Sequence, residues 1–295
     1  MMGRMVVLGL GYSGQAVARR ARRLGWDVAG TARDPASLPP LPGIESLAFA
    51  GAGEAILRAS HIVVTAAPNE NGDPVLAAHG AAIARGLDAG TLRWVGYVST
   101  TGVYGNRDGG WVDEASAPAP AQPRSRRRVA AEDQWRAALA GRAALDIARA
   151  GGIYGPGRSV LDELREGSAR RVVKPGHAFS RIHRDDIALA LCAAAGQTLP
   201  PAVRILHLVD DEPAESAVVV EGAAAMLGVA PPAPVPFEEA RARMSEMALS
   251  FWSENRRVAN AATKAALGIS WLYPSWREGL ASILREERGE GVLEQ

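Results

Sequence analysis

The chain has 295 residues, of which 47% are hydrophobic and 22% charged, and these proportions exclude a disordered or fibrous protein. Its 33 Lys and Arg residues nearly balance its 32 Asp and Glu residues, and the net charge of +1 excludes the strong positive field of a general nucleic-acid binder. The length suits one large α/β domain, or a main domain with a smaller lobe.

The cellular compartment is predicted from cysteine content and hydropathy. Cys192 is the single cysteine and forms no internal disulfide, which is compatible with a reducing cytosol. No apolar run reaches the roughly 18 residues needed to span a bilayer. The first ten residues lack the long apolar stretch and cleavage site of a secretory signal. We therefore expect a cytoplasmic protein with a small-molecule substrate and with neither membrane nor nucleic acid as partner. The sequence does not indicate the oligomeric state.

The first hundred residues alternate between short apolar runs and helical patterns. Residues 5–10 form an apolar run that ends in glycine, as a buried parallel strand does, and residues 15–24 carry apolar side chains at helical spacing. Further strands are predicted over 26–31, 44–50, 61–65 and 92–99, and helices over 52–59 and 74–89. This alternation predicts a parallel sheet covered by helices on both faces.

The second half is less regular. Residues 106–128 are rich in Gly, Pro and charge and are predicted as a loop. A helix is predicted over 129–140, a strand over 144–153, a helix over 182–195 and a last strand over 203–209. The remainder is predicted as helical, with a proline-rich linker over 231–236.

A glycine pattern separates the first strand from the first helix. Gly9, Gly11 and Gly14 have the G-x-G-x-x-G spacing, in which the first glycine permits a tight turn, the second lets a pyrophosphate approach and the third lets the helix pack on the strand. The alternative is an ordinary glycine-rich turn. We favour a dinucleotide-binding turn that includes Tyr12 and Ser13, because the helix N-terminus offers N–H groups to an anion.

The residues after the second strand bear on the choice of cofactor. An acidic residue about 20 positions after the turn would bind the ribose 2′-OH of NAD, but no Asp or Glu lies between Val28 and Arg33. Arg33 instead offers a planar fork that suits a 2′-phosphate, and Thr31 could add a hydroxyl. The sequence therefore favours NADP, with NAD as the alternative.

Four motifs in order carry a family resemblance. The glycine turn, Val98–Gly105 (VSTTGVYG), Gly152–Pro156 (GIYGP) and Ile182–Ile187 (IHRDDI) resemble the extended short-chain dehydrogenase/reductases of the NAD(P)-dependent epimerase/dehydratase family. The resemblance implies an α/β fold with a Rossmann-type doubly wound parallel sheet and a small, mainly helical C-terminal lobe. It implies an NAD(P)-binding domain over 1–155 plus about 180–210, and a substrate-binding lobe over about 156–179 and 211–295. It also implies further cofactor contacts, at Ala66, Ala67, Pro68, Ser99, Gly152, Ile153 and Tyr154.

The resemblance implies catalytic residues that this chain keeps only in part. Thr100, four residues before Tyr104, matches the family's catalytic Ser/Thr, and Ser99 and Thr101 are the alternative positions. The alternative role for Thr100 is structural, with its hydroxyl capping the end of the strand. The family's Tyr-x-x-x-Lys pair is missing, because no tyrosine here has a lysine four residues later. Alignment with the family places Arg124 at the tyrosine position and Arg128 at the lysine position.

This replacement changes the chemistry that the family would use. Arg128 can still donate to ribose hydroxyls, but an arginine at position 124 cannot exchange a proton near neutral pH, since its pKa exceeds about 12. Tyr104 is the nearest phenol that could supply the proton, with packing as the alternative. Tyr154 and His183 follow as candidates, although the family's histidine more often positions its loop.

Two hypotheses of different classes follow. The first is an oxidoreductase or epimerase/dehydratase-like enzyme that acts on a small polar substrate. Several arginines are predicted on the substrate side, and they favour an anionic one. The second is a catalytically weak NAD(P)-binding sensor or regulatory protein. No histidine is spaced with Cys or carboxylates as a metal ligand, so no metal site is expected.

Overall fold

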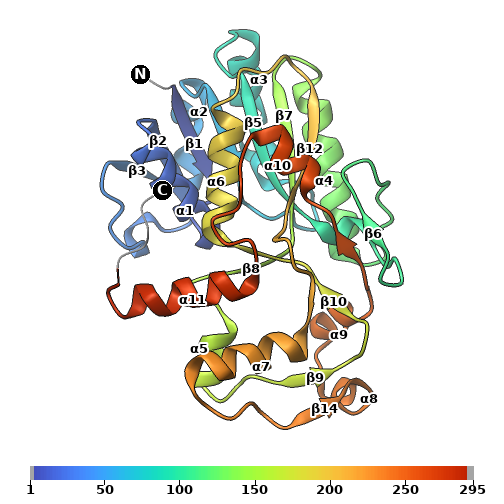
Figure 1. Ribbon diagram of the computed structural model, residues 1–295. Helices are drawn as coiled ribbons and strands as arrows, with labels where there is room; N and C mark the ends of the chain where they lie inside the picture. Colours follow the sequence, from blue (N-terminus) through green and yellow to red (C-terminus); the bar gives the residue numbers. More distant parts are fainter. Residues whose placement is uncertain (1–2, 291–295) are drawn as a thin grey trace.

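The computed structural model describes residues 3–290, which form a seven-stranded parallel sheet with helices on both faces and a smaller lobe beyond one sheet edge (Figure 1). The strand order is β12-β7-β5-β4-β1-β2-β3. The strands are β1 (Arg4–Leu8), β2 (Asp27–Ala32), β3 (Ile44–Ala48), β4 (His61–Val64), β5 (Trp94–Thr100), β7 (Ala144–Ala150) and β12 (Val203–Leu208). Every residue of β4 and β7 is buried, as expected for strands covered on both faces.

Two hydrophobic clusters attach the helices to the sheet. One face is covered by α1 (Tyr12–Arg23), α6 (Arg184–Ala195) and α10 (Ala261–Leu267). The other face is covered by α2 (Gly53–Leu57), α3 (Pro74–Asp88) and α4 (Pro123–Leu139). The predicted doubly wound parallel sheet is confirmed. None of the helices within residues 3–290 combines the length and hydropathy of a membrane span.

The smaller lobe lies below the sheet in Figure 1 and has its own apolar core. That core joins α5 (Val160–Arg165), α7 (Ser216–Leu227) and α11 (Trp276–Glu287). Two short pairings add to the lobe: β9 (Arg171–Val173) with β14 (Pro234–Pro236), and β10 (Ala178–Phe179) with β13 (Ala214–Glu215). Its remaining helices are α8 (Phe237–Ala240) and α9 (Glu246–Trp252).

After α9 the chain returns to the sheet domain. β15 (Arg257–Val258) pairs with β6 (Trp111–Val112), and α10 and Trp271 then pack into the core beside the sheet. Within the stretch predicted as small lobe, α7 and α11 pack in the lobe core, whereas β15, α10 and Trp271 pack against the sheet domain.

Several predicted boundaries differ from the structure, and the remainder predicted as helical also contains β13, β14 and β15. Residues 123–128, predicted as loop, form the start of α4, where Pro123 at the first helical turn supplies a suitable φ and lacks the N–H that would go unpaired there. The predicted strand 144–153 divides into β7 and β8 (Gly152–Tyr154). The predicted helix 182–195 starts at Arg184, because residues 181–183 form β11 (Arg181–His183), which pairs with β8. Short 3-10 helices cover Pro35–Ser37, Phe49–Gly51, Thr101–Tyr104 and Arg241–Arg243.

Candidate cofactor and substrate site

The glycine turn has the geometry of a phosphate cradle. Gly9 has a φ of +120°, its N–H donates to Thr31 Oγ1 at 3.1 Å, and its carbonyl accepts from Thr65 Oγ1 at 2.6 Å. A Cβ on Gly14 would lie 1.9 Å from the Gly9 oxygen, so the helix packs on the strand only with glycine there. A Cβ on Gly11 would meet nothing within 4 Å. The turn therefore leaves open the space that a pyrophosphate requires, and these residues fit a dinucleotide.

Tyr12 connects the turn to the segment after β8. Its hydroxyl donates to the Pro156 carbonyl at 3.1 Å, and the guanidinium groups of Arg184 and Arg158 lie 5.0 and 5.5 Å from its ring centroid. Partial burial raises the pKa of Tyr12. Ser13 is half-buried in the first turn of α1. The Tyr12 hydroxyl thus lies against Gly155 and Pro156, the segment that follows β8.

The two residues predicted near the ribose have different environments. Thr31 is fully buried, and its hydroxyl accepts from the Gly9 N–H, so it shapes the turn. Arg33 is exposed just beyond β2. Asp34 caps the following 3-10 helix by accepting from the Ala36 N–H at 3.1 Å. Arg33 is therefore the exposed cation just after β2, while the Asp34 carboxylate is used as a helix cap.

The other predicted cofactor contacts lie at the carboxyl ends of their strands. Ala66, Ala67 and Pro68 follow β4 beside the turn, and the Ala66 N–H donates to the Leu8 carbonyl at 3.2 Å. Ser99 is buried and donates to Glu132 Oε1 at 2.5 Å, so its hydroxyl is already used. These positions lie after β4 and near the end of β5, and the carboxyl ends of these strands share one edge with that of β1 because the strands are parallel.

The β8 positions divide between the cavity and the lobe. Gly152 borders the cavity described below, whereas Ile153 packs against the core beside the sheet. The Tyr154 hydroxyl lies 3.5 Å from the Ser275 carbonyl and would be 2.0 Å from a Cβ on Gly279, so it points toward α11. Burial raises the pKa of Tyr154, which makes it a poor proton donor.

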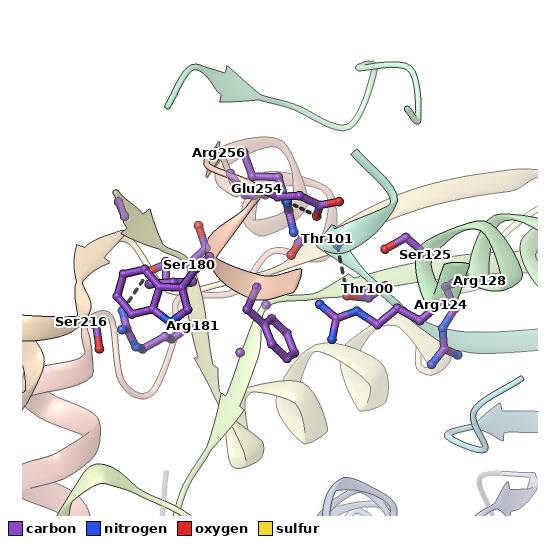
Figure 2. Close-up of a pocket in the computed structure, with 18 residues that line it drawn as sticks. Thr100, Thr101, Arg124, Ser125, Arg128, Ser180, Arg181, Ser216, Glu254 and Arg256 are labelled. Carbon is purple, nitrogen blue, oxygen red and sulfur yellow. Dashed lines mark hydrogen bonds and ion pairs between the residues drawn. The ribbon is translucent and has the colours of Figure 1, made fainter. Parts of the chain in front are cut away.

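A cavity of about 510 Å³ lies between the carboxyl ends of β5 and β7 and the lobe (Figure 2). Four arginines, one acid, hydroxyl groups and aromatic rings surround it. Its walls are Thr100, Thr101, Gly102, Arg124, Ser125, Arg128, Gly151, Gly152, Ala178, Phe179, Ser180, Arg181, Ser216, Phe251, Trp252, Glu254, Arg256 and Val258. Among these described lining residues there is no Tyr, His, Lys or Cys.

Two hydroxyl groups converge on one side of this cavity. Thr100 ends β5, and its Oγ1 accepts from the Gly102 N–H at 3.1 Å. A Cβ on Gly102 would lie 3.1 Å from Ser125 Oγ and 3.4 Å from Thr100 Oγ1, so both oxygens border the same space. From the sequence, Ser125 is noted only as the neighbour of Arg124, the residue at the position of the family's tyrosine, and is given no role.

The two arginines at the positions of the family's Tyr-x-x-x-Lys pair both reach the cavity wall. Arg128 Nη1 donates to the Tyr97 hydroxyl at 2.9 Å and to the Val98 carbonyl at 3.0 Å, so it is anchored to β5. The Arg124 guanidinium instead lies over the ring of Phe251, 3.7 Å from its centroid. Burial lowers the pKa of Arg124, and the nearby Glu254 carboxylate opposes this shift.

Tyr104 does not reach the cavity. Its ring is fully buried, and its hydroxyl accepts from Arg149 Nη1 at 2.7 Å and lies 2.5 Å from His207 Nε2. His207 Nδ1 lies 2.7 Å from the Ala259 carbonyl, so Nδ1 carries the proton and Nε2 accepts from the phenol. Burial raises the pKa of Tyr104. The geometry therefore favours the packing interpretation of this residue over a proton-donating one.

His183, another proton-donor candidate, caps a helix. Its Nδ1 accepts from the Asp185 N–H at 3.3 Å at the start of α6, and burial lowers its pKa to about 4. Within residues 3–290, no group of three His, Cys, Asp or Glu side chains is arranged to hold a metal ion.

The lobe supplies cavity residues that the sequence reasoning missed. Phe251 and Trp252 end α9, and Glu254 and Arg256 follow in the segment that returns to the sheet domain. Arg256 Nη1 donates to Glu254 Oε2 at 2.8 Å and to the Gly105 carbonyl at 3.0 Å. No local motif marks this segment, which is held over the site by the β6–β15 pairing and by hydrogen bonds of Asn255 to Asn106 and Arg107.

Comparisons with known proteins extend this description. No protein-family model matches the chain. A 3-diazoavenalumate denitrifying reductase from a Streptomyces species is 32% identical over 140 residues, a match that spans 45% of each chain. A functionally unknown conserved protein from Silicibacter pomeroyi DSS is 39% identical, with a TM-score of 0.87 over 97% of this chain and 99% of that one.

More distant structures place the fold. MoeE5 in complex with UDP-glucuronic acid and NAD has a TM-score of 0.75 at 19% identity, over 98% of this chain and 100% of that chain. A human epimerase family protein with NADPH has a TM-score of 0.72 at 19% identity, over 95% of this chain and 98% of that chain. Further matches include a protein described as an NAD-dependent epimerase/dehydratase and a UDP-glucose 4-epimerase. The chain has the fold of the NAD-dependent epimerase/dehydratase proteins. The epimerase/dehydratase fold extends over nearly the whole chain, including the residues after Ile187, which carry none of the four motifs.

Proposed function

We propose that this protein is an NAD(P)H-dependent oxidoreductase that reduces a small, polar, anionic substrate in the cavity beside Thr100. The supporting observation is the position of that cavity, which adjoins the carboxyl ends of β5 and β7 on the same sheet edge as the open glycine turn. Similarity to a reductase over 45% of the chain also supports reduction.

The cofactor we propose is NADP, with NAD as the alternative. Arg33 is the exposed cation beyond β2, and a planar guanidinium can bind a 2′-phosphate with two hydrogen bonds. Asp34, the nearest acid, is occupied as a helix cap. The structural neighbours include proteins determined with NAD and with NADPH, so the fold accommodates either.

The chain's own residues would have separate roles. The bound nicotinamide would supply a hydride when reduced. Thr100 would hold the reacting group of the substrate by a hydrogen bond, and Arg128, fixed on β5, would hold the ribose hydroxyls. Because the described cavity wall has no phenol, imidazole or amine, we propose that any proton the product needs comes from water.

A second candidate is an NAD(P)-binding sensor without turnover. The composition of the cavity wall favours this sensor, since the described lining residues include neither the tyrosine nor the lysine that the family uses. The two candidates agree on cofactor binding and differ only in catalysis.

The test is to titrate NADPH and NADH, and then to measure NADPH oxidation over a panel of aldehydes, ketones, oxo acids and nucleotide sugars. The reductase proposal expects tight NADPH binding and turnover that is lost in Gly11→Val. Binding without turnover on any panel member would favour the sensor, and absence of binding to either dinucleotide would contradict both.

A further inference from the structure

Arg124 differs from the three other arginines around the cavity in having no protein acceptor. Each of those three arginines donates through Nη1 to two protein acceptors, as described above for Arg128 and Arg256. For Arg181 the acceptors are the carbonyls of Phe179 and Ala214, at 2.9 and 3.0 Å. Within residues 3–290, Arg124 donates no side-chain hydrogen bond, and Figure 2 shows it facing the space beside Thr100. Its donors are therefore available to a ligand.

The orientation of that guanidinium is fixed without hydrogen bonds. Arg124 lies in the first turn of α4, and the group stacks 3.7 Å from the centroid of the Phe251 ring. Stacking on an aromatic ring holds the guanidinium plane while leaving its edge free. The free edge presents parallel N–H groups, the arrangement that binds a carboxylate with two hydrogen bonds.

The charges around Arg124 favour an anion. Glu254 is the one acid among the described lining residues, and its Oε2 already accepts from Arg256. The four cationic side chains thus exceed the protein's own anionic charge in the cavity. An anionic ligand would offset this excess.

The apolar residues of the cavity wall indicate the shape and polarity of the part of the ligand that lies beyond its anionic group. Phe179, Trp252 and Val258 line the cavity, with Ala178 and three glycines adding small surfaces. Flat apolar walls of this kind suit a planar, weakly polar body. A pyrophosphate, with at least two negative charges, would call for several unanchored cations, and Arg124 alone has its whole fork free.

We propose that Arg124 is the substrate anchor of the proposed reductase, and that it binds the carboxylate of a small planar organic acid, most simply an aryl or conjugated carboxylate. The proposal rests on the proposed function for its catalytic meaning. It gives the residue at the position of the family's tyrosine a binding role in place of proton transfer.

The test is calorimetric titration of benzoate and trans-cinnamate, with benzamide and cinnamamide as uncharged partners of the same shape and UDP as the nucleotide probe. The proteins are the parent, Arg124→Gln, Arg124→Lys and, as a matched control, Arg127→Gln. Arg127 is exposed on the same helix and does not line the cavity. Melting temperature and NADPH affinity are measured for each protein.

The expected result is that a carboxylate binds at least tenfold more tightly than its amide. Arg124→Gln should remove this preference, Arg124→Lys should restore it in part, and Arg127→Gln should keep it, with NADPH affinity unchanged throughout. Equal binding of acid and amide, unchanged binding in Arg124→Gln, or no carboxylate binding in the millimolar range would overturn the proposal. Tighter binding of UDP than of either acid, lost in Arg124→Gln, would assign the residue to a nucleotide instead.

Failure of this inference is distinguishable from failure of the proposed function. The carboxylate titrations require no cofactor, whereas the proposed function fails when neither dinucleotide binds or when no substrate is turned over.

Discussion

Arg149 donates to both carboxylate oxygens of Glu132, at 3.1 and 2.7 Å, and the two side chains are 3% and 2% exposed. The same carboxylate accepts from Ser99, and the same guanidinium donates to Tyr104. This pair joins β5, β7 and α4 directly behind the Thr100 side of the cavity. It therefore holds in register the elements that carry Thr100, Arg124 and Arg128.

Arg149→Met should lower the free energy of unfolding by about 3–5 kcal/mol, because it leaves the Glu132 carboxylate buried without its cation. Urea denaturation measures the change. The matched control is Arg142→Met, whose partner Asp88 is exposed, and it should cost less than about 1 kcal/mol. Equal effects of the two substitutions would contradict the structural role assigned to the buried pair.

Gly11→Val should abolish dinucleotide binding and leave the melting temperature nearly unchanged. Gly11 has a φ of −76°, which valine adopts, and its Cβ would stand in the open space above the turn. Gly14→Ala should instead destabilise the fold, since its Cβ would lie 1.9 Å from the Gly9 oxygen. Thermal melts with dinucleotide titrations separate the two effects, and an undiminished affinity in Gly11→Val would remove the turn from the site.

Arg33→Asp should weaken NADPH binding and shift the preference toward NADH. The carboxylate would repel a 2′-phosphate and could accept from a 2′-hydroxyl. Parallel titrations of both cofactors on the parent and the variant give the ratio. A ratio that does not change would exclude Arg33 as the 2′-phosphate ligand.

Thr100→Val should lower turnover, whereas Tyr104→Phe should lower stability. Loss of the Thr100 hydroxyl should reduce kcat about 10²- to 10³-fold, the usual cost of a lost donor at the reacting atom. Tyr104→Phe removes the phenolic partner of Arg149 Nη1 and of His207 Nε2, so it should cost about 1–3 kcal/mol of stability and spare most of the turnover. Turnover lost in Tyr104→Phe at unchanged stability would restore Tyr104 as the proton donor.

The raised pKa of the buried Asp210 carboxyl should make the stability of the protein depend on pH. Burial of this side chain raises its pKa to about 8, despite the opposing effects of the Arg181 charge and of the backbone N–H groups of Arg181 and Glu212. The folded chain therefore binds this proton more tightly than the unfolded chain, whose aspartate pKa is about 3.9. The resulting stabilisation is full below about pH 4 and is lost as the pH rises to about 8.

Asp210→Asn should remove this contribution to the pH dependence. Melting temperatures of parent and variant at pH 5 and pH 9 should show the variant gaining relative to the parent at pH 9. Asp186, whose pKa is raised to about 7 by burial, is present in both proteins and contributes the same pH dependence of stability to each. Parallel pH profiles would show that Asp210 is ionised in the fold at every pH tested.

The sheet and the glycine turn were predictable because their signals are local. β1 and β4 are short apolar runs, and Gly9 and Gly14 meet within a single turn. The start of α4 was missed because arginines and prolines mask a helix whose position is set by packing of Ala131 and Trp135 against the sheet.

The substrate side of the site was predictable only in part. Thr100 and Arg128 lie on the cavity wall, since motif spacing fixes positions along a strand and a helix. The direction of Tyr104 depends on Arg149 and His207, which are distant in sequence, so motif spacing could not predict it. Glu254 and Arg256 reach the cavity through the pairing of β6 with β15, a contact that leaves no local pattern.

The most direct test of the proposed reductase is product analysis after reaction with NADPH that carries deuterium at the transferred position of nicotinamide C4, using the best substrate of the panel. Reduction predicts one deuterium in each product molecule and one NADP⁺ formed per product. Product that forms without net oxidation of NADPH would contradict the account and indicate an epimerase or dehydratase cycle.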